Sequence, residues 1–333
     1  MPGRGTEGNL SYRRHPEYRG LPGVAQVWPV TKVLTMLERL SILVPMNILS
    51  LARRTAIVKA LVEGNSVRAT ARLTGTSKNT VLRLLVDLGE LCSIYQDHVL
   101  TNLQCERVQC DEIWSFVGIK QKHLPGHERY KGRGDVWTYT ALCADTKLML
   151  SWLVGHRNVK NTNLFMRDVK SRLAKRVQLT TDGLYLYPQA VEKAFGWQKA
   201  DYAKLIKIYG KDESAERTYS PAVCIGIETE VVMGNPNPEH ISTSFVERSN
   251  LTMRMGMRRF TRLTNAFSKK MENHAHAVAL HAFHYNFIRP HTTLTKSHPL
   301  RYPTTPAMAA GKADHIWTVE ELCGLLDPQR LLQ

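Results

Sequence analysis

Three acidic residues, far apart in the sequence, could together bind divalent metal ions. Asp111 lies inside an apolar and aromatic run, Arg107 to Val117, that is typical of a buried strand. Asp182 follows a second short apolar run, and Glu247 lies at the start of a basic segment. A carboxylate inside a buried strand is unfavourable unless a cation or hydrogen-bond donors compensate its charge. We therefore interpret Asp111, Asp182 and Glu247 as a metal site.

The chemistry of such a site follows from its oxygen ligands. Carboxylates favour Mg²⁺ or Mn²⁺ over zinc. Two such ions, about 3.5–4 Å apart, can activate an attacking oxygen and stabilise the leaving 3′ oxygen of an in-line displacement at phosphorus. The same site could nick DNA with water and then join the released 3′ hydroxyl to another duplex. We expect Mg²⁺ or Mn²⁺ as the cofactor, with two ions bound and no covalent link between protein and DNA.

Each acid also has a purely structural explanation. Asp111 could end a strand in a salt bridge, and Glu112 competes for the metal because adjacent strand residues point to opposite faces of a sheet. Asp182 precedes a glycine, which is an ordinary turn signal. Glu247 lies three residues after Ser244, the spacing of a helix capping box. The metal interpretation therefore depends on convergence of all three acids, together with DNA-binding features elsewhere.

The segments around the acids predict an α/β domain. Apolar and β-branched runs predict strands over residues 107–117, 135–145, 147–155, 176–181 and 202–208. Helices are expected over 161–173, 185–195 and 271–287, with a further helical part beginning at Ser244, a short hairpin over 223–232 and a tail helix over 319–326. The predicted core has the element order of a ribonuclease-H-like fold, which is three strands, a helix, a strand, a helix and a strand. The predicted fold is a ribonuclease-H-like mixed sheet with flanking helices, preceded by an all-α helix-turn-helix domain.

Two short helical segments precede this core. Asn65–Ser66 and Ser77 are residue types that cap helices, and Gly75 can adopt the positive φ of a tight turn. A helix over 67–73, this turn and a helix over 78–88 form the pattern of a helix-turn-helix. The alternative is a plain three-helix bundle with a solvated polar face. In the DNA-binding interpretation, the exposed residues of the second helix are Ser77, Lys78, Asn79, Thr80 and Arg83.

The charge of the chain also favours nucleic acid. It has 45 Lys and Arg against 29 Asp and Glu, a formal net charge of +16. Such an excess attracts polyanions over long range and is favoured further by counterion release. Ribosome-binding and membrane-surface proteins share it, so charge alone is a weak signal. With the helix-turn-helix pattern, it predicts double-stranded DNA as the partner.

Cysteine usage and hydropathy indicate the compartment. The six cysteines form no C-x-x-C pair, which favours reduced thiols in a cytosolic protein. No apolar run approaches the roughly 18 residues of a membrane span, so we expect no membrane association. On the helix after residue 270, His274, His281 and His284 share a broad face, which we expect to be polar and directed toward DNA or solvent.

The predicted organisation has four parts. Residues 1–45, rich in glycine, proline and arginine, are expected to form a disordered or extended arm. Residues 46–100 form the helix-turn-helix domain, and residues 105–290 the catalytic domain. Residues 291–333 form a C-terminal loop and a short helix.

The motifs around the acids resemble those of a known family. Asp111 in CDEIWSFVG, Asp182 in TTDGLYLYP and Glu247 in FVERSNLTMR resemble the Asp-Asp-Glu triad of bacterial insertion-sequence transposases. The segments RRFTRLTNAFSKK, NHAHAVALHAFHYNF and TPAMAAG resemble the insertion-sequence-one type. Some members of that type carry a cysteine zinc finger ahead of the helix-turn-helix. No cysteine precedes Cys92 here, so we expect no zinc module.

The resemblance implies a DNA transposase. Such an enzyme binds the terminal inverted repeats of a mobile element and performs Mg²⁺-dependent strand cleavage and strand transfer, as a homo-oligomer at the bacterial nucleoid. It implies Asp111, Asp182 and Glu247 as catalytic, metal-binding residues, and Arg248 and Asn250 as residues that contact DNA or orient Glu247. The basic segment adds DNA contacts through Arg254, Arg258 and Arg259. The alternatives are an inactive, sequence-specific DNA-binding regulator of the same fold and a nuclease that does not join strands.

Overall fold

The computed structural model describes residues 49–125, 132–197, 199–210, 223–261 and 265–327. The predicted arm over residues 1–45 lies outside the described residues. The helices and strands follow in this order: α2 (Leu51–Val62), α3 (Val67–Leu73), α4 (Lys78–Val99), β1 (Arg107–Val117), β2 (Gly134–Cys143), β3 (Met149–Gly155), α5 (Val159–Arg172), β4 (Val177–Thr181), α6 (Tyr187–Phe195), β5 (Ala200–Gly210), β6 (Val223–Met233), α7 (Ser244–Gly256), α8 (Met271–Phe283), α9 (Thr292–Ser297), α10 (Pro306–Ala309) and α11 (Val319–Gly324). Short 3₁₀ turns lie at Gln121–His123, Pro238–His240 and Arg258–Phe260, and a π-turn at His284–Ile288.

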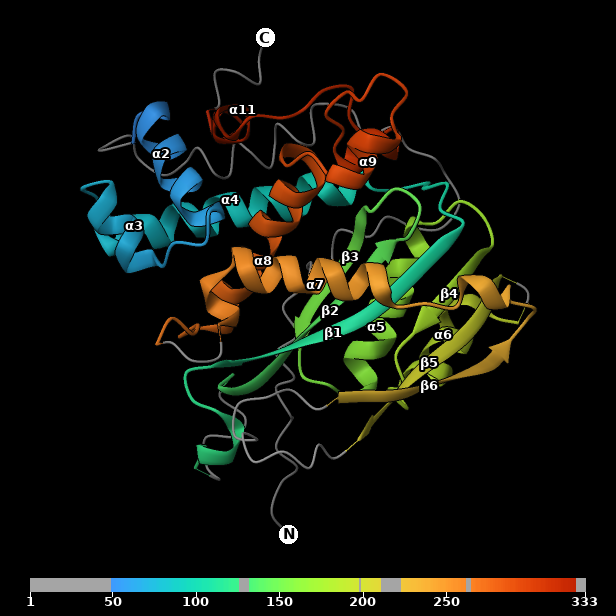
Figure 1. The fold of residues 1–333 in the computed structure, drawn as a ribbon. Coiled ribbons are helices and arrows are strands. Elements are labelled where there is room, and N and C mark those ends of the chain that lie inside the picture. Colours follow the sequence, from blue (N-terminus) through green and yellow to red (C-terminus); the bar gives the residue numbers. More distant parts are fainter. Residues whose placement is uncertain (1–48, 126–131, 198, 211–222, 262–264, 328–333) are drawn as a thin grey trace, which may run out of the picture.

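A six-stranded mixed sheet forms the centre of the molecule (Figure 1). Its strand order is β3-β2-β1-β4-β5-β6. Strands β1, β2 and β3 are antiparallel neighbours, whereas β4 is parallel to both β1 and β5. This arrangement is that of a ribonuclease-H-like fold. The predicted α/β fold class, a mixed sheet with flanking helices, is confirmed.

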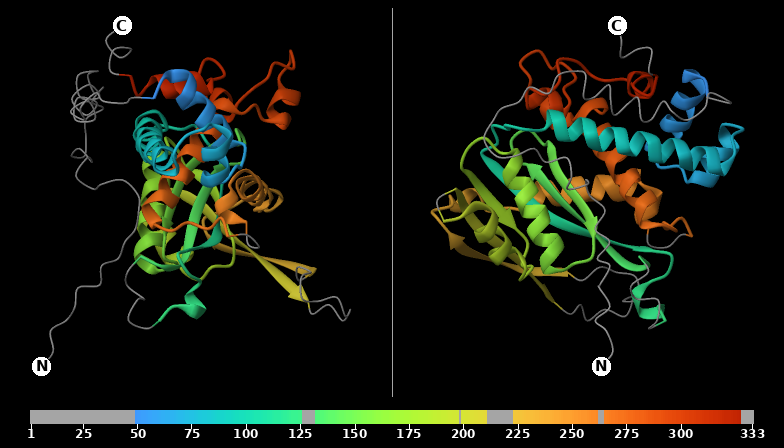
Figure 2. Two further views of the ribbon diagram at one scale, coloured as in Figure 1. Left: turned by 90° about the vertical axis from the view of Figure 1, so that its left-hand side faces the viewer. Right: turned by 180° about the vertical axis from the view of Figure 1, so that it is seen from behind.

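Helices cover both faces of this sheet (Figures 1 and 2). Helix α7 crosses one face against β1 and β2, and α5 packs with α6 and β3 on the other. All seven residues of β3 are buried, as are the last six of β2. Strands covered on both faces contain long apolar runs rather than a strict apolar–polar alternation, which is why these segments could be predicted as strands.

Helices α2, α3 and α4 form where the helix-turn-helix pattern predicts them. The Oγ atoms of Ser50, Ser66 and Ser77 each accept a backbone N–H in the first turn of the helix that follows. Gly75, with φ +60°, provides the turn before α4. The predicted helix over 78–88 continues to Val99 and packs along α8. The apolar side chains of α4 belong to the same hydrophobic cluster as the sheet, and the division into domains remains a prediction.

Three element predictions were wrong in detail. Helix α5 begins at Val159 rather than after Asn161, because Asn158 Oδ1 accepts the Asn161 N–H and caps the helix. The segment 223–232 is not a hairpin of its own, since β6 pairs with β5 in one long antiparallel ribbon that projects from the body of the molecule (Figure 2).

The third difference is the end of the helix predicted over 271–287. Helix α8 ends at Phe283 and opens into the π-turn. The wider turn directs the buried amide of Asn286 to the backbone N–H and carbonyl of Met149, each at 2.9 Å. This turn therefore fixes α8 to the edge of the sheet. Across the described ranges, no helix is both long and apolar enough to cross a membrane.

Candidate metal centre

Two of the predicted acids lie where two parallel strands stop pairing. The β1–β4 ladder ends at the pair Cys110↔Thr181, so Asp111 and Asp182 are the next residue on each strand. Ligand sites in open α/β sheets form at such carboxyl ends. Strand β1 continues to Val117 paired with β2, and beyond Cys110 it has no further ladder with β4; an isolated bridge joins Val117 to Ser268.

Three carboxylates converge at this point. Asp111, Glu112 and Asp182 each offer an oxygen within 4.8 Å of the others. Glu112, which we weighed only as a competitor of Asp111, therefore lies in the same group as Asp111 and Asp182. Asp111 contacts α7 on one face of the sheet, and Glu112 lies beside Tyr187 of α6 on the other. The side chains of Asp111 and Glu112 both reach Asp182 because β4 ends at Thr181, so no strand on that side of β1 separates the two faces at this level.

The pKa values of these acids show how crowded their charges are. Burial, with the charge of Asp182 as the next cause, raises the pKa of Asp111 to about 6. The same two causes, in the same order, raise the pKa of Glu112 to about 8, and burial raises the pKa of Asp182. Closely spaced buried carboxylates are destabilised as anions unless a cation neutralises them. A set of hard oxygen donors in this state fits Mg²⁺ or Mn²⁺.

Glu247, the third predicted acid, lies on the first turn of α7 and outside this group of three. Its Oε1 accepts the Thr243 hydroxyl at 2.6 Å, and its Oε2 accepts from Lys207 Nζ. Its charge contributes to the raised pKa values of Asp111 and Asp182, so it lies close enough to act on both. The structure thus brings two of the three predicted acids together and puts the third on the helix beside them.

Gln109, which sequence reasoning missed, sets the position of that helix. The predicted capping box of Ser244 and Glu247 does not form. Instead Gln109 Oε1, from β1, accepts the N–H groups of Phe245 at 2.9 Å and Val246 at 3.1 Å. The available signal was a polar residue two positions before Asp111, on the same face of an otherwise apolar strand.

Asn250 makes a second connection between α7 and β1. Its Nδ2 donates to Asp111 Oδ2 at 2.8 Å, and its Oδ1 accepts the Thr140 hydroxyl at 2.8 Å. Both ends of this buried amide are used inside the protein. Asn250 was predicted to contact DNA or to orient Glu247, and in the structure it orients Asp111.

Arg157, also missed, provides positive charge next to the acids. It donates to Glu112 Oε2 at 3.0 Å and lies 3.8 Å from Asp182 Oδ2. Its guanidinium stacks over the Trp137 ring, 4.5 Å from the centroid. Arg157 lies in the connection between β3 and α5, where no periodic pattern marks a functional residue.

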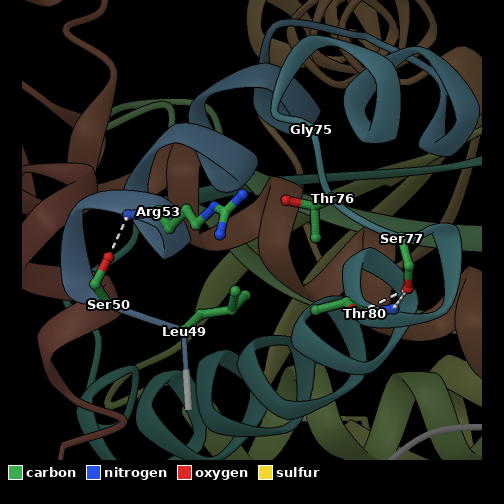
Figure 3. A pocket seen from close by; sticks show the side chains of 7 residues that line it. All are labelled: Leu49, Ser50, Arg53, Gly75, Thr76, Ser77 and Thr80. Atoms are coloured by element: carbon green, nitrogen blue, oxygen red, sulfur yellow. Dashed lines mark hydrogen bonds between the residues drawn. The ribbon is translucent and has the colours of Figure 1, made fainter. Parts of the chain in front are cut away.

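The predicted DNA-reading residues surround the first turn of α4. Ser77, Lys78, Asn79 and Arg83 are exposed and Thr80 is half-buried. A hollow of about 480 Å³ lies beside this turn, and none of the three acids lines it. Figure 3 shows the hollow from close by. It lies between the start of α2 and the turn before α4, and its lining residues are Leu49, Ser50, Arg53, Gly75, Thr76, Ser77 and Thr80.

The predicted basic residues after Glu247 differ in exposure. Arg248, Arg254 and Arg258 are exposed. The Arg259 guanidinium points inward and donates to Ser268 Oγ at 2.9 Å, so a DNA contact by Arg259 would require that bond to break. The far end of α7 contacts the turn after α2, where a Cβ on Gly64 would lie 3.4 Å from the Gly256 carbonyl oxygen. Helix α7 therefore runs from the acids to the turn between α2 and α3.

The predicted polar histidine face of α8 is wrong. His274 is fully buried between the hydroxyls of Ser268 and Ser115, and burial lowers its pKa to about 3. His281 is also buried, and its pKa is likewise lowered to about 3 by burial. These histidines pack inside the protein because α8 is enclosed by α4 and β3.

Comparisons with known proteins give little further information. No family model matches the chain, and no curated protein matches it. Among solved structures, the chain is similar to a piggyBac transposase synaptic complex with hairpin DNA, at 9% identity over 91% of this chain and 77% of that chain, with a TM-score of 0.33. A similarity this low carries no argument about family or function.

Proposed function

We propose that this chain is a DNA transposase of the Asp-Asp-Glu type, similar to the insertion-sequence-one enzymes. It binds the terminal inverted repeats of a mobile element and performs strand cleavage and strand transfer with Mg²⁺ or Mn²⁺. The observation that carries the proposal is the convergence of Asp111 and Asp182 at the ends of adjacent parallel strands, with Glu247 on the helix that crosses them. Two bound ions would supply activation of the attacking oxygen and stabilisation of the leaving 3′ oxygen.

In this proposal the residues of the chain have separate tasks. Asp111, Asp182 and Glu247 hold the ions, and Asn250 orients the Asp111 carboxylate through the bond from its amide. Lys207, which is bonded to Glu247 Oε2, neutralises that acid in the absence of metal. Ordering of these groups before DNA arrives lowers the cost of assembling the charged site.

Two basic surfaces would bind the DNA. The first turn of α4 reads the inverted repeat, and the exposed arginines of α7 and the 3₁₀ turn after it, Arg248, Arg254 and Arg258, contact the phosphates between the repeat and the acids. The contact between Gly64 and Gly256 supports this division, because it brings the end of α7 against the turn between α2 and α3, and both of these helices pack against α4. Pairing of two DNA ends would require a homo-oligomer.

The test uses a duplex that carries the ends of the element, incubated with Mg²⁺. We expect nicking with a free 3′ hydroxyl, followed by joining to a target plasmid, and loss of both with Asp182→Asn. A control variant, Asp135→Asn, changes a partly exposed carboxylate of β2 and should nick at the wild-type rate. Equal residual activity of wild type and Asp182→Asn would refute the assignment. Specific binding without nicking would favour an inactive DNA-binding regulator, and nicking without joining would favour a simple nuclease.

A further inference from the structure

Glu112 is more than a neighbour of Asp111 in the strand. Its side chain is only 1% exposed, yet one of its carboxylate oxygens, Oε1, has no hydrogen-bond partner among the described residues. The Tyr187 hydroxyl lies close enough to lower the pKa of Glu112. Among the described residues, however, this hydroxyl makes no hydrogen bond of normal geometry. A buried carboxylate oxygen without a partner costs free energy, so its presence calls for a missing ligand.

The position of Glu112 indicates which ligand is missing. One of its oxygens lies within 4.8 Å of oxygens of both Asp111 and Asp182. Among the charges that shift the pKa of Glu112, Asp182 comes first, whereas Glu247 acts on Asp111 and Asp182. Asp111, Glu112 and Asp182 thus form one set, and Glu247 acts on the two aspartates of that set.

We propose that Glu112 is a fourth carboxylate ligand of the metal centre, which it approaches from the α6 face of the sheet. In the absence of metal, the Arg157 guanidinium is the counter-ion of Glu112 instead. This inference rests on the proposed function and adds a ligand that the Asp-Asp-Glu pattern does not contain. The occupant is a hard divalent cation, Mg²⁺ or Mn²⁺, because every donor is a carboxylate oxygen. Asp182, which contacts Arg157 together with Glu112, is the aspartate assigned with Glu112 to the second ion.

The contacts of Arg157 support the second half of the proposal. Its guanidinium reaches both Glu112 and Asp182, the two acids assigned to the second ion. Arg157 is one-third exposed, so its guanidinium can leave the pocket without unfolding the surrounding chain. A cation bound through Glu112 Oε1 would lie on the same two carboxylates that the Arg157 guanidinium neutralises through their other contacts. The metal ion and Arg157 therefore compete for the negative charge of Glu112 and Asp182.

The experiment is a Mn²⁺ titration of the DNA-free protein, followed by electron paramagnetic resonance of the free ion. We expect two ions per wild-type chain. Glu112→Gln keeps the size of the side chain and an acceptor for Arg157, but it should lose the second ion or bind it at least about tenfold more weakly. Glu106→Gln, an exposed carboxylate just before β1, is the matched control and should titrate as wild type. Arg157→Met should bind the second ion several-fold more tightly.

The outcomes separate this inference from the proposed function. If Glu112→Gln binds two ions with wild-type affinity while Asp111→Asn does not, Glu112 is no ligand and the proposed function stands. If wild type binds no Mn²⁺ at millimolar concentration, both fail. If Glu112→Gln does not fold, the Arg157→Met titration decides, since weaker or unchanged binding by that variant would overturn the exchange of Arg157 for metal.

Discussion

The bond between Gln109 and the start of α7 allows a sharp test of how Glu247 is positioned. Gln109→Leu keeps the approximate volume of the side chain but removes the oxygen that accepts the N–H groups of Phe245 and Val246. Thr243, the N-cap residue of α7, makes no side-chain capping bond, so no other cap replaces Gln109. The first turn of α7, which carries Glu247, would then be held less firmly.

The expected loss of stability follows from these two bonds. Val246 is fully buried, whereas Phe245 is 38% exposed. In Gln109→Leu, water can therefore replace the hydrogen bond to the Phe245 N–H but not the one to the Val246 N–H. Loss of a helix N-cap costs about 0.5–2 kcal/mol, and a buried donor left without a partner costs about 1–3 kcal/mol. We expect Gln109→Leu to lower the free energy of unfolding by about 1–3 kcal/mol. For a chain of this size each kcal/mol corresponds to roughly 2–4 °C in Tm.

The effect on activity should exceed the effect on stability. A catalytic group displaced by about 1 Å can reduce a rate by roughly 100-fold. At a temperature where the variant is fully folded, we expect Mg²⁺-dependent nicking by Gln109→Leu to fall by about 10- to 100-fold. Gln109→Glu keeps an acceptor for both N–H groups; its charge is favourable at a helix N-terminus but unfavourable when buried near Asp111, so it should lose less stability than Gln109→Leu without matching wild type.

The assay combines thermal unfolding by circular dichroism with initial nicking rates on end DNA. Gln104→Leu, at an exposed position ahead of β1, is the control for the substitution itself. If Gln109→Leu melts and nicks like Gln104→Leu, the bond to α7 has no role. If its Tm falls while its nicking rate stays at the wild-type level, Gln109 stabilises the helix without positioning Glu247.

Three further predictions follow from the acids, a buried histidine and the basic surfaces. Asp182→Asn should raise the Tm of the metal-free protein, because it removes a repelling buried charge, and should abolish the rise in Tm that Mg²⁺ gives wild type. The folded-state pKa of His281 is about 3 and its unfolded value about 6.5, so unfolding takes up a proton below pH 6.5 and stability is lost as pH falls. In urea unfolding, the stability that wild type loses relative to His281→Phe should grow from about 0.7 kcal/mol per pH unit at pH 6.5 toward about 1.4 kcal/mol per pH unit at pH 5; parallel curves would contradict this. Lys78→Ala and Arg258→Ala should each reduce the slope of log Kd against log salt concentration by about one for end DNA, as measured by fluorescence anisotropy, if each contacts one phosphate.

The strands and the general location of the acids could be predicted because they depend on local pattern. The run Arg107–Val117 is apolar since both faces of β1 are covered, and its span was predicted to the residue. Asp182 could be located after a strand because Val177–Thr181 is short, apolar and followed by a turn signal. Helix starts at Ser66 and Ser77 follow from capping, which is a local hydrogen bond.

The contacts that complete the site could not be predicted because they are long-range. Gln109 caps a helix that begins 135 residues later, at Ser244. Arg157 reaches Glu112 across a separation of 45 residues. Neither contact leaves a periodic signal in the sequence, since each depends on which loops the folded sheet brings to the end of β1. The burial of His274 had the same origin, because the polar face of α8 meets Ser115 and Ser268 rather than solvent.

The grouping of Glu112 with Asp111 has a more general cause. The rule that adjacent strand residues face opposite sides of a sheet held, since Asp111 meets α7 and Glu112 meets α6. The structure contradicts only the idea that acids on opposite faces must lie apart, since oxygens of Asp111, Glu112 and Asp182 lie within 4.8 Å of one another. That idea requires a neighbouring strand between the two side chains, and β4 ends at Thr181, one residue too early to separate them. Where a parallel neighbour stops, two consecutive acids can therefore both reach a third at the strand end, and a sequence pair such as Asp111–Glu112 should be weighed as two ligands rather than one.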